Sequence, residues 1–117
     1  MNEFVTRHYG DSIMSDIINP PIHPGEILLE VYIEPLGLSQ NKLAESLDVD
    51  PGRINRIVTG KSIITADTAL RLARYFGTTP QLWMNLQAKY DLDVTKAKKA
   101  REIEKKVQVR PRGAVTV

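Results

Sequence analysis

The 117-residue chain is predicted to fold as an all-α protein of five helices, with an extended C-terminal helix and short tails. Two observations support this prediction. Apolar residues recur at the three- and four-residue spacing of amphipathic helices. Residues that start or stop helices, among them Ser, Thr, Asp, Pro and Gly, separate the apolar segments. The length and the 42% hydrophobic content suit one domain with one core.

Residues 1–22 are expected to form an irregular leader, because their polarity is mixed and Pro20 and Pro21 close the segment. Met14 could be a second translation start, which would make residues 1–13 dispensable. The first helix is predicted to begin at Pro24 and to end near Glu34, before Pro35. Its predicted core contacts share the helical spacing: Ile27, Leu28, Val31 and Tyr32.

The second helix has a clear start signal. Ser39 is a good N-cap, and Leu38 with Leu43 can form a hydrophobic staple across it. Leu43, Ala44 and Leu47 recur at helical spacing and are predicted to face inward. Ala44 is small, at a position where two helices must approach closely.

The third helix repeats the same device after a tight turn. Asp50 is its predicted N-cap and Pro51 its first residue, while Asp48 lies where the turn needs a left-handed residue. Gly60 is the expected left-handed residue that ends the helix. Its inward residues are predicted to be Ile54, Ile57 and Val58, with Val49 and Ile54 as the staple.

The fourth helix is predicted to run from Thr65 to about Phe76, with Gly77 as its stop. The fifth is predicted to begin with Thr79 as cap and Pro80 at its first position. The inward residues of the fourth helix are predicted to be Ala69, Leu70, Ala73 and Phe76. The stripe of the fifth consists of Leu82, Trp83, Leu86 and Tyr90, core residues rather than a base-stacking platform.

The fifth helix is predicted to bend at residues 91–95, after which helical spacing resumes through Val94, Ala97, Ala100 and Ile103. Its apolar edge (Leu86, Tyr90, Val94 and Ala97) has two interpretations: a homodimer surface, or a helix packed back on its own core. Residues 107–117 are either a loose tail or a strand offered to a partner. The predicted organisation is a leader (1–22), a helix-turn-helix domain (23–90) and an extension with tail (91–117).

Two short helices joined by a tight turn can place the second helix in the DNA major groove. Arg pairs bidentately with guanine and Asn with adenine, and a helix N-terminus suits a phosphate. The candidate DNA-binding residues are Ser39, Gln40, Pro51, Gly52, Arg53, Asn55, Arg56, Thr59 and Lys61. The alternative is that Arg53 and Arg56 are only solvated surface charges, since Asp48 and Asp50 add negative charge nearby.

Catalysis finds no support in the sequence, and we expect neither an enzyme nor a cofactor. Of the two histidines, His23 precedes Pro24 and is interpreted as a helix-start residue, while His8 lies in the leader. His23 with Glu26 is too small a set for a metal site. There is no cysteine, no signal pattern and no run near the ~20 apolar residues of a membrane span. We therefore expect a cytoplasmic protein without membrane contact.

Residues 23–92 resemble the HigA/VapI type of antitoxin in the Cro/C1-repressor-like (XRE) helix-turn-helix family. The most specific motifs are the opening His23-Pro24-Gly25-Glu26 and the late Trp83-Met84-Asn85-Leu86-Gln87. The resemblance implies the Cro/C1-repressor-like fold and a type II toxin-antitoxin antitoxin that represses its own operon and neutralises a RelE-like ribonuclease. The alternative is a stand-alone phage-type repressor without a toxin partner; a folded interaction module with a degenerate DNA face is a third.

Charge is distributed unevenly along the chain. Residues 1–37 hold six acidic residues and one basic residue, a net of −5, whereas residues 89–112 hold nine basic and four acidic, a net of +5. Because a ribonuclease presents a basic surface to RNA, the glutamates at four-residue spacing, Glu26, Glu30 and Glu34, are the candidate toxin-binding stripe. The rival is that the basic residues 96–112 or the terminal segment make this contact.

Overall fold

The computed structural model describes residues 20–111, in which five helices follow one another. They are α2 (Pro24–Ile27) continuing as η1 (Leu28–Ile33), α3 (Gln40–Leu47), α4 (Pro51–Val58), α5 (Ala66–Phe76) and α6 (Pro80–Lys106). The predicted all-α, five-helix fold is confirmed, with α2 and η1 counted as one helix. The expectations for residues 1–19, including the second start at Met14, lie outside the described residues.

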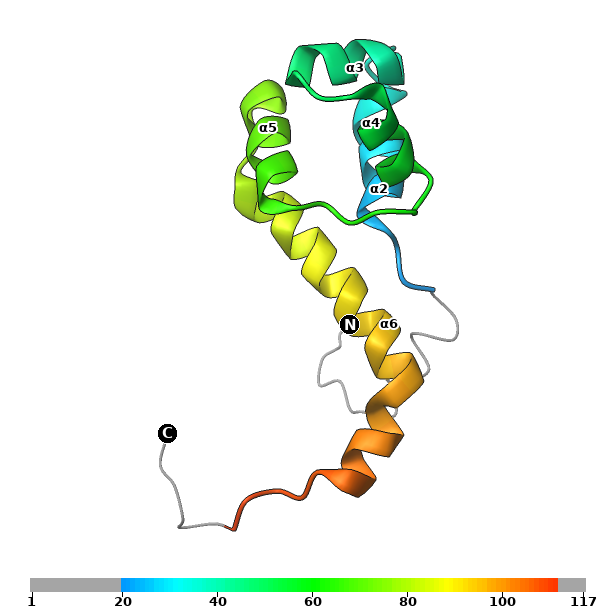
Figure 1. Ribbon diagram of the computed structural model, residues 1–117, viewed down its shortest axis with the longest axis vertical. Helices are drawn as coiled ribbons and strands as arrows, with labels where there is room; N and C mark the ends of the chain where they lie inside the picture. The colour runs from blue at the N-terminus through cyan, green and yellow to red at the C-terminus, as the bar shows by residue number, and fades with distance from the viewer. Residues whose placement is uncertain (1–19, 112–117) are drawn as a thin grey trace, which may run out of the picture.

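The helices form a head and a long projecting arm. Figure 1 shows α2, α3, α4 and α5 grouped together in the head, while α6 begins beside α5 and extends away from the head. The core inside the head contains the buried side chains of Leu28, Ile33, Leu43, Ala44, Leu47, Ile54, Ile57, Ile64, Ala69, Leu72, Ala73 and Trp83. None of the helices in residues 20–111 is both long and apolar enough to cross a membrane.

The first helix widens into a π-helix after Ile27. The Glu34 N–H donates to the Leu29 carbonyl five residues back, at 2.9 Å, and the buried residues Leu28 and Ile33 are likewise five apart. The prediction of Val31 as a core contact is wrong, because its side chain is 54% exposed. An ordinary helical period aims Val31 inward, whereas the wider turn brings Ile33 to the core instead.

The start of α2 lies against α4 with no space for a side chain. A Cβ atom on Gly25 would stand 1.8 Å from the Ile57 carbonyl oxygen, so only glycine fits there. The buried His23 caps α2 by accepting the Gly25 N–H on Nδ1 at 2.9 Å. This confirms the interpretation of His23 as a helix-start residue. Its ring also meets the Tyr90 ring edge-on, with centroids 4.9 Å apart.

The bounds of α5 agree with the prediction: Thr65 is its N-cap and Gly77 its left-handed stop. Its inward face differs in part, since Leu70 is 60% exposed whereas Leu72 is fully buried. The prediction that Leu70 faces inward is therefore wrong. At 3.6 residues per turn, residues two positions apart lie on nearly opposite sides of a helix. Leu70 and Leu72 therefore cannot both face the core.

The predicted bend at residues 91–95 is also wrong, because α6 is one continuous helix with Thr79 as cap and Pro80 at its first position. The two aspartates of this segment support the helix. Asp91 accepts from Gln87 at 3.0 Å and Asp93 from Lys89 at 2.9 Å, each four residues back. Residues 107–111 adopt neither helix nor strand, and the rest of the tail lies outside the described residues.

Candidate nucleic-acid interface

Short-range capping contacts build the pair of helices α3 and α4. The Ser39 hydroxyl accepts the Lys42 N–H and an Asp50 carboxylate oxygen accepts the Gly52 N–H, both at 2.9 Å. Asp48 in the connecting turn has φ of 59°, and Gly60 after α4 has φ of 78°. All four predictions for these residues are confirmed: Ser39 and Asp50 begin the two helices, Asp48 ends α3 and Gly60 follows the end of α4.

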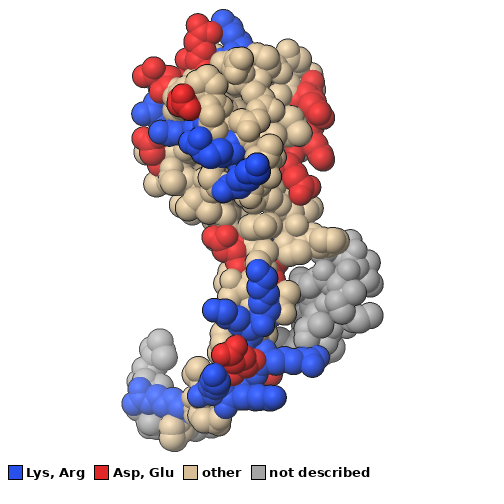
Figure 2. Space-filling model, turned by 45° about the vertical axis from the view of Figure 1, so that its right-hand side comes forward, with Lys and Arg blue, Asp and Glu red and all other residues tan. Residues whose placement is uncertain are grey.

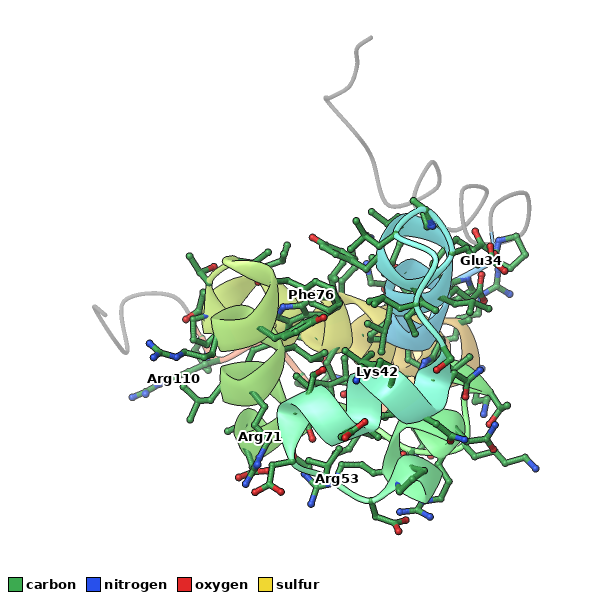
Figure 3. All side chains as sticks on the ribbon, turned by 90° about the horizontal axis from the view of Figure 1, so that it is seen from above. Glu34, Lys42, Arg53, Arg71, Phe76 and Arg110 are labelled. Carbon is green, nitrogen blue, oxygen red and sulfur yellow. The ribbon has the colours of Figure 1, made fainter. Side chains whose placement is uncertain are left out.

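The outer face of α4 is polar and open to solvent. Asn55, Arg56, Thr59 and the following Lys61 are all exposed, while Ile54 and Ile57 on the opposite face are buried. The Asn55 side-chain amide lies 3.4 Å from the Gln40 side-chain oxygen, which brings the N-terminus of α3 to the same face. Figure 3 shows α3 and α4 together on one side of the head. The exposed side chains of this face are therefore accessible to a partner.

The remaining candidate residues on this face, apart from Pro51, have structural partners or limited exposure. Pro51 is exposed and Gly52 is half-buried in the first turn of α4. The Ser39 hydroxyl oxygen already serves as the cap of α3. The Thr59 hydroxyl donates to the Asn55 carbonyl at 2.8 Å, within its own helix. The exposed polar atoms of Asn55, Arg56 and Lys61 are thus the most accessible of the set.

Arg53 is tied to α5 by a partner that the sequence did not indicate. Its NH1 group donates to Asp67 Oδ2 at 2.8 Å, and Arg71 donates to the same oxygen through Nε at 2.9 Å. Hydrogen bonds from Arg71, and then from Arg53, lower the pKa of the Asp67 carboxyl below its ordinary value. The four-residue spacing of Asp67 and Arg71 was a visible signal for that pair, but nothing marked Asp67 as the partner of Arg53.

An open groove of about 420 Å³ borders Arg53, between α4, residues 61–65 and α5. Three arginines (Arg53, Arg56 and Arg71) and one carboxylate (Asp67) line it together with Ser62, Ile63, Thr65 and Thr68. The excess of positive charge favours an anion such as a phosphate. In Figure 2 one group of basic side chains lies on the head, with acidic side chains on either side, and another lies along the C-terminal half of α6.

Gln87 is a further residue of the site region that sequence reasoning did not select. It is buried, and its side-chain oxygen accepts the Ile64 N–H at 2.7 Å, which joins the segment after α4 to α6. Only its place in the late Trp83-to-Gln87 motif pointed to it. Within residues 20–111, no cluster of His, Cys, Asp or Glu side chains has the arrangement to hold a metal ion.

The sequence of this chain is similar to those of known helix-turn-helix proteins. A family model described as helix-turn-helix matches residues 29–83. Virulence-associated protein I of Dichelobacter nodosus is 56% identical over 80 residues, which are 68% of this chain and 74% of that protein. Antitoxin HigA-1 of Vibrio cholerae is 35% identical over 72 residues, which are 62% of this chain and 68% of that protein.

Solved structures show the same similarity. Antitoxin HigA of Pseudomonas aeruginosa, solved with the higBA promoter, has a TM-score of 0.73 and 42% identity, covering 75% of this chain and 96% of that one. PA4674 of the same species, solved with its operator DNA, has a TM-score of 0.75 and 41% identity, covering 77% and 97%. The fold and the exposed polar helix assign this chain to the class of helix-turn-helix regulators. Within that class, the chain belongs to the HigA/VapI branch of the XRE family.

Proposed function

We propose that this protein is the antitoxin of a type II toxin-antitoxin module. It binds operator DNA as a homodimer, represses its own operon and neutralises a RelE-like ribonuclease toxin. The observation that supports DNA binding most directly is the exposed set of Asn55, Arg56 and Lys61 on or beside α4, next to the arginine-lined groove. Relatives of 41% and 42% identity were solved with operator or promoter DNA.

In this proposal the α4 helices of a dimer enter adjacent major grooves, with centres about 34 Å apart along the duplex. The test is a titration of the protein on the promoter fragment upstream of its gene, at physiological salt, against random DNA of equal length. Tighter binding to the promoter fragment is expected. Equal affinity for both fragments would contradict the repressor function, because non-specific binding depends on phosphates alone.

The dimer is proposed to form through the apolar edge of α6. Leu86 packs against the monomer core and the Tyr90 ring meets His23, so these two also serve the monomer. Val94 is half-buried and Ala97 exposed, beyond the head, which leaves them for a second copy. Light scattering should show a dimer at tens of micromolar and a monomer for Ala97→Glu, while Lys98→Glu stays dimeric. A truncation after Asp93 that remains dimeric would count against this surface.

The toxin is proposed to bind the acidic stripe of the first helix. Glu26, Glu30 and Glu34 are all exposed. Figure 3 places Glu34 and Arg53 on opposite sides of the head, so a toxin on the stripe leaves α4 free for DNA. The positive charge of residues 96–112 is the rival surface, and it would repel rather than attract a basic toxin.

Charge reversal separates these surfaces in cells that co-express the neighbouring toxin frame. The triple change of Glu26, Glu30 and Glu34 to Lys should abolish rescue of growth and keep promoter binding. The matched control changes three exposed glutamates elsewhere, Glu45, Glu102 and Glu104, to Lys and should keep rescue. Full rescue by the stripe variant removes this surface, and a neighbouring frame that is not toxic favours the stand-alone repressor. Relatives named HTH-type transcriptional regulators, 42–46% identical, fit that second function.

A further inference from the structure

We propose that Asp67 is a positioning residue for DNA readout: it holds one end of the Arg53 guanidinium so that the other edge is presented to operator DNA. The proposal rests on the DNA binding proposed above and adds a residue outside the helix pair. Asp67 lies in the first turn of α5 and is separated from Arg53 by 14 positions in the sequence.

The contacts of Arg53 divide its guanidinium into two parts. NH1 donates to Asp67 Oδ2 at 2.8 Å and lies 3.4 Å from the Thr68 hydroxyl oxygen, so this nitrogen is directed at α5. Those bonds do not involve Nε or the second terminal nitrogen, which together form an edge with the geometry for two parallel hydrogen bonds. The Arg53 side chain remains 38% exposed. A guanidinium held at one nitrogen therefore still has a donor edge to offer to a guanine or a phosphate.

Asp67 is itself held in place from a third element. Arg71 donates through Nε to Asp67 and through NH1 to the Leu47 carbonyl at 2.9 Å and the Asp48 carbonyl at 3.2 Å. Through Arg71, the carboxylate is thus linked to the end of α3 and the turn that follows it. A long side chain that is already ordered loses less rotamer freedom on binding, and this favours the site for which its geometry is correct.

The position of the pair indicates a role in recognition rather than in packing alone. Arg53 is the third residue of α4, and the N-terminal residues of such a helix are the ones that reach base edges. The pair also borders the arginine-lined groove, where the positive charges outnumber the carboxylate by three to one. A bare carboxylate near phosphates would only repel DNA of every sequence, whereas a positioning carboxylate improves the preferred sequence over others.

The test compares full-length wild type, Asp67→Ala and Asp67→Asn on the promoter fragment and on random DNA, at one salt concentration. Glu45→Ala is the matched control, because Glu45 is an exposed acid of α3 paired with Lys42 at 3.5 Å. The promoter-to-random affinity ratio should fall roughly 5- to 100-fold in Asp67→Ala, the range of one good base contact. Asp67→Asn keeps an oxygen acceptor and should retain more of the ratio, and Glu45→Ala should leave it unchanged.

Combination with Arg53→Ala completes the test. The double variant should show the same ratio as Arg53→Ala alone, because the carboxylate acts through the arginine. The proposal is overturned if Asp67→Ala binds both DNA fragments more tightly by the same factor, or if both Asp67 variants keep the wild-type affinity ratio. It is also overturned if the losses of ratio caused by Asp67→Ala and Arg53→Ala multiply in the double variant. Thermal unfolding shows whether Asp67→Ala folds. If it does not, the affinity ratio of Asp67→Asn decides the test. A wild type without preference contradicts the proposed function itself, which distinguishes the two failures.

Discussion

The side-chain oxygen of Gln87 accepts the backbone N–H of Ile64 at 2.7 Å, and the same side chain donates to Asp91 at 3.0 Å. Gln87 is only 5% exposed, so water cannot easily replace either bond. One buried amide thereby connects α6 with the segment that follows α4. This contact joins the part of the head that contains α4 to the projecting helix.

Replacement of Gln87 by Ala should lower the free energy of unfolding by about 1–3 kcal/mol, because the Ile64 N–H is left buried without an acceptor. Urea denaturation measures this change. Gln81→Ala is the control: Gln81 is exposed and its side-chain amide donates to Asn85 at 3.2 Å, on the surface, so its loss should stay within about 0.5 kcal/mol. Equal effects of the two substitutions would show that the buried amide does not stabilise the fold.

Replacement of Gly25 by Ala should be among the most damaging single changes in the head. The added Cβ would stand 1.8 Å from the Ile57 carbonyl oxygen, so α2 must move away from α4, at a cost of roughly 3 kcal/mol or more. Gly37→Ala is the comparison, since Gly37 has φ of 66° but open space around it, and should cost about 1–2 kcal/mol. Thermal unfolding of both variants measures the two losses of stability. A smaller loss for Gly25→Ala than for Gly37→Ala would contradict the prediction.

Replacement of Arg56 by Ala should weaken promoter binding by roughly 1–3 kcal/mol if the exposed guanidinium reads a base, and should weaken random DNA much less. Gln40→Ala, at the N-terminus of α3, should weaken binding to both DNA fragments about equally, because a phosphate contact carries no sequence information. Fluorescence anisotropy titrations on the two fragments measure both effects. An unchanged promoter-to-random ratio in Arg56→Ala would remove Arg56 from base readout.

The lowered pKa of the Asp67 carboxyl predicts that the stability of the fold depends on pH. Its pKa is lowered in the folded chain, chiefly by the hydrogen bond from Arg71 and then by that from Arg53. The folded state therefore favours the charged form, so the stabilisation is present above the ordinary value of 3.8 and is lost as pH falls through the folded pKa.

Unfolding midpoints of wild type and Asp67→Asn should accordingly differ most near neutral pH and converge below about pH 3.8. In an Arg71→Ala background the difference near neutral pH should shrink, because the largest cause of the lowered pKa is removed. A difference that is the same at pH 3 and pH 7 would show that charge on Asp67 is not what stabilises the fold.

The helix boundaries could be predicted from the sequence because they depend on neighbours a few residues apart. Ser39, Asp50, Thr65 and Thr79 each cap a helix within their own turn, and the left-handed residues follow the same local rule. The exposed face of α4 was predictable for the same reason. Once the buried stripe of a short helix is assigned, the outer positions are fixed by its period.

Features that depend on packing between distant elements could not be predicted. Val31 and Leu70 have helical spacing and apolar side chains, yet both are exposed: η1 brings Ile33 to the core in place of Val31, and α5 turns Leu72 inward in place of Leu70. The Arg53–Asp67 pair and the Gln87–Ile64 bond join residues 14 and 23 positions apart, and one sequence gives no signal for such pairs. These contacts are also the ones that shape the candidate site around α4.

Because α6 has no bend, it acts as a lever. The stretch from Gln87 to Lys106 is about 28 Å long at 1.5 Å per residue, so a tilt of about 10° at the head displaces the far end by roughly 5 Å. The reverse also holds: a partner bound to the far end of α6 would act on the hydrogen bond between Gln87 and Ile64, beside α4. If α4 enters the major groove as proposed, such a partner would change the angle at which α4 meets the duplex.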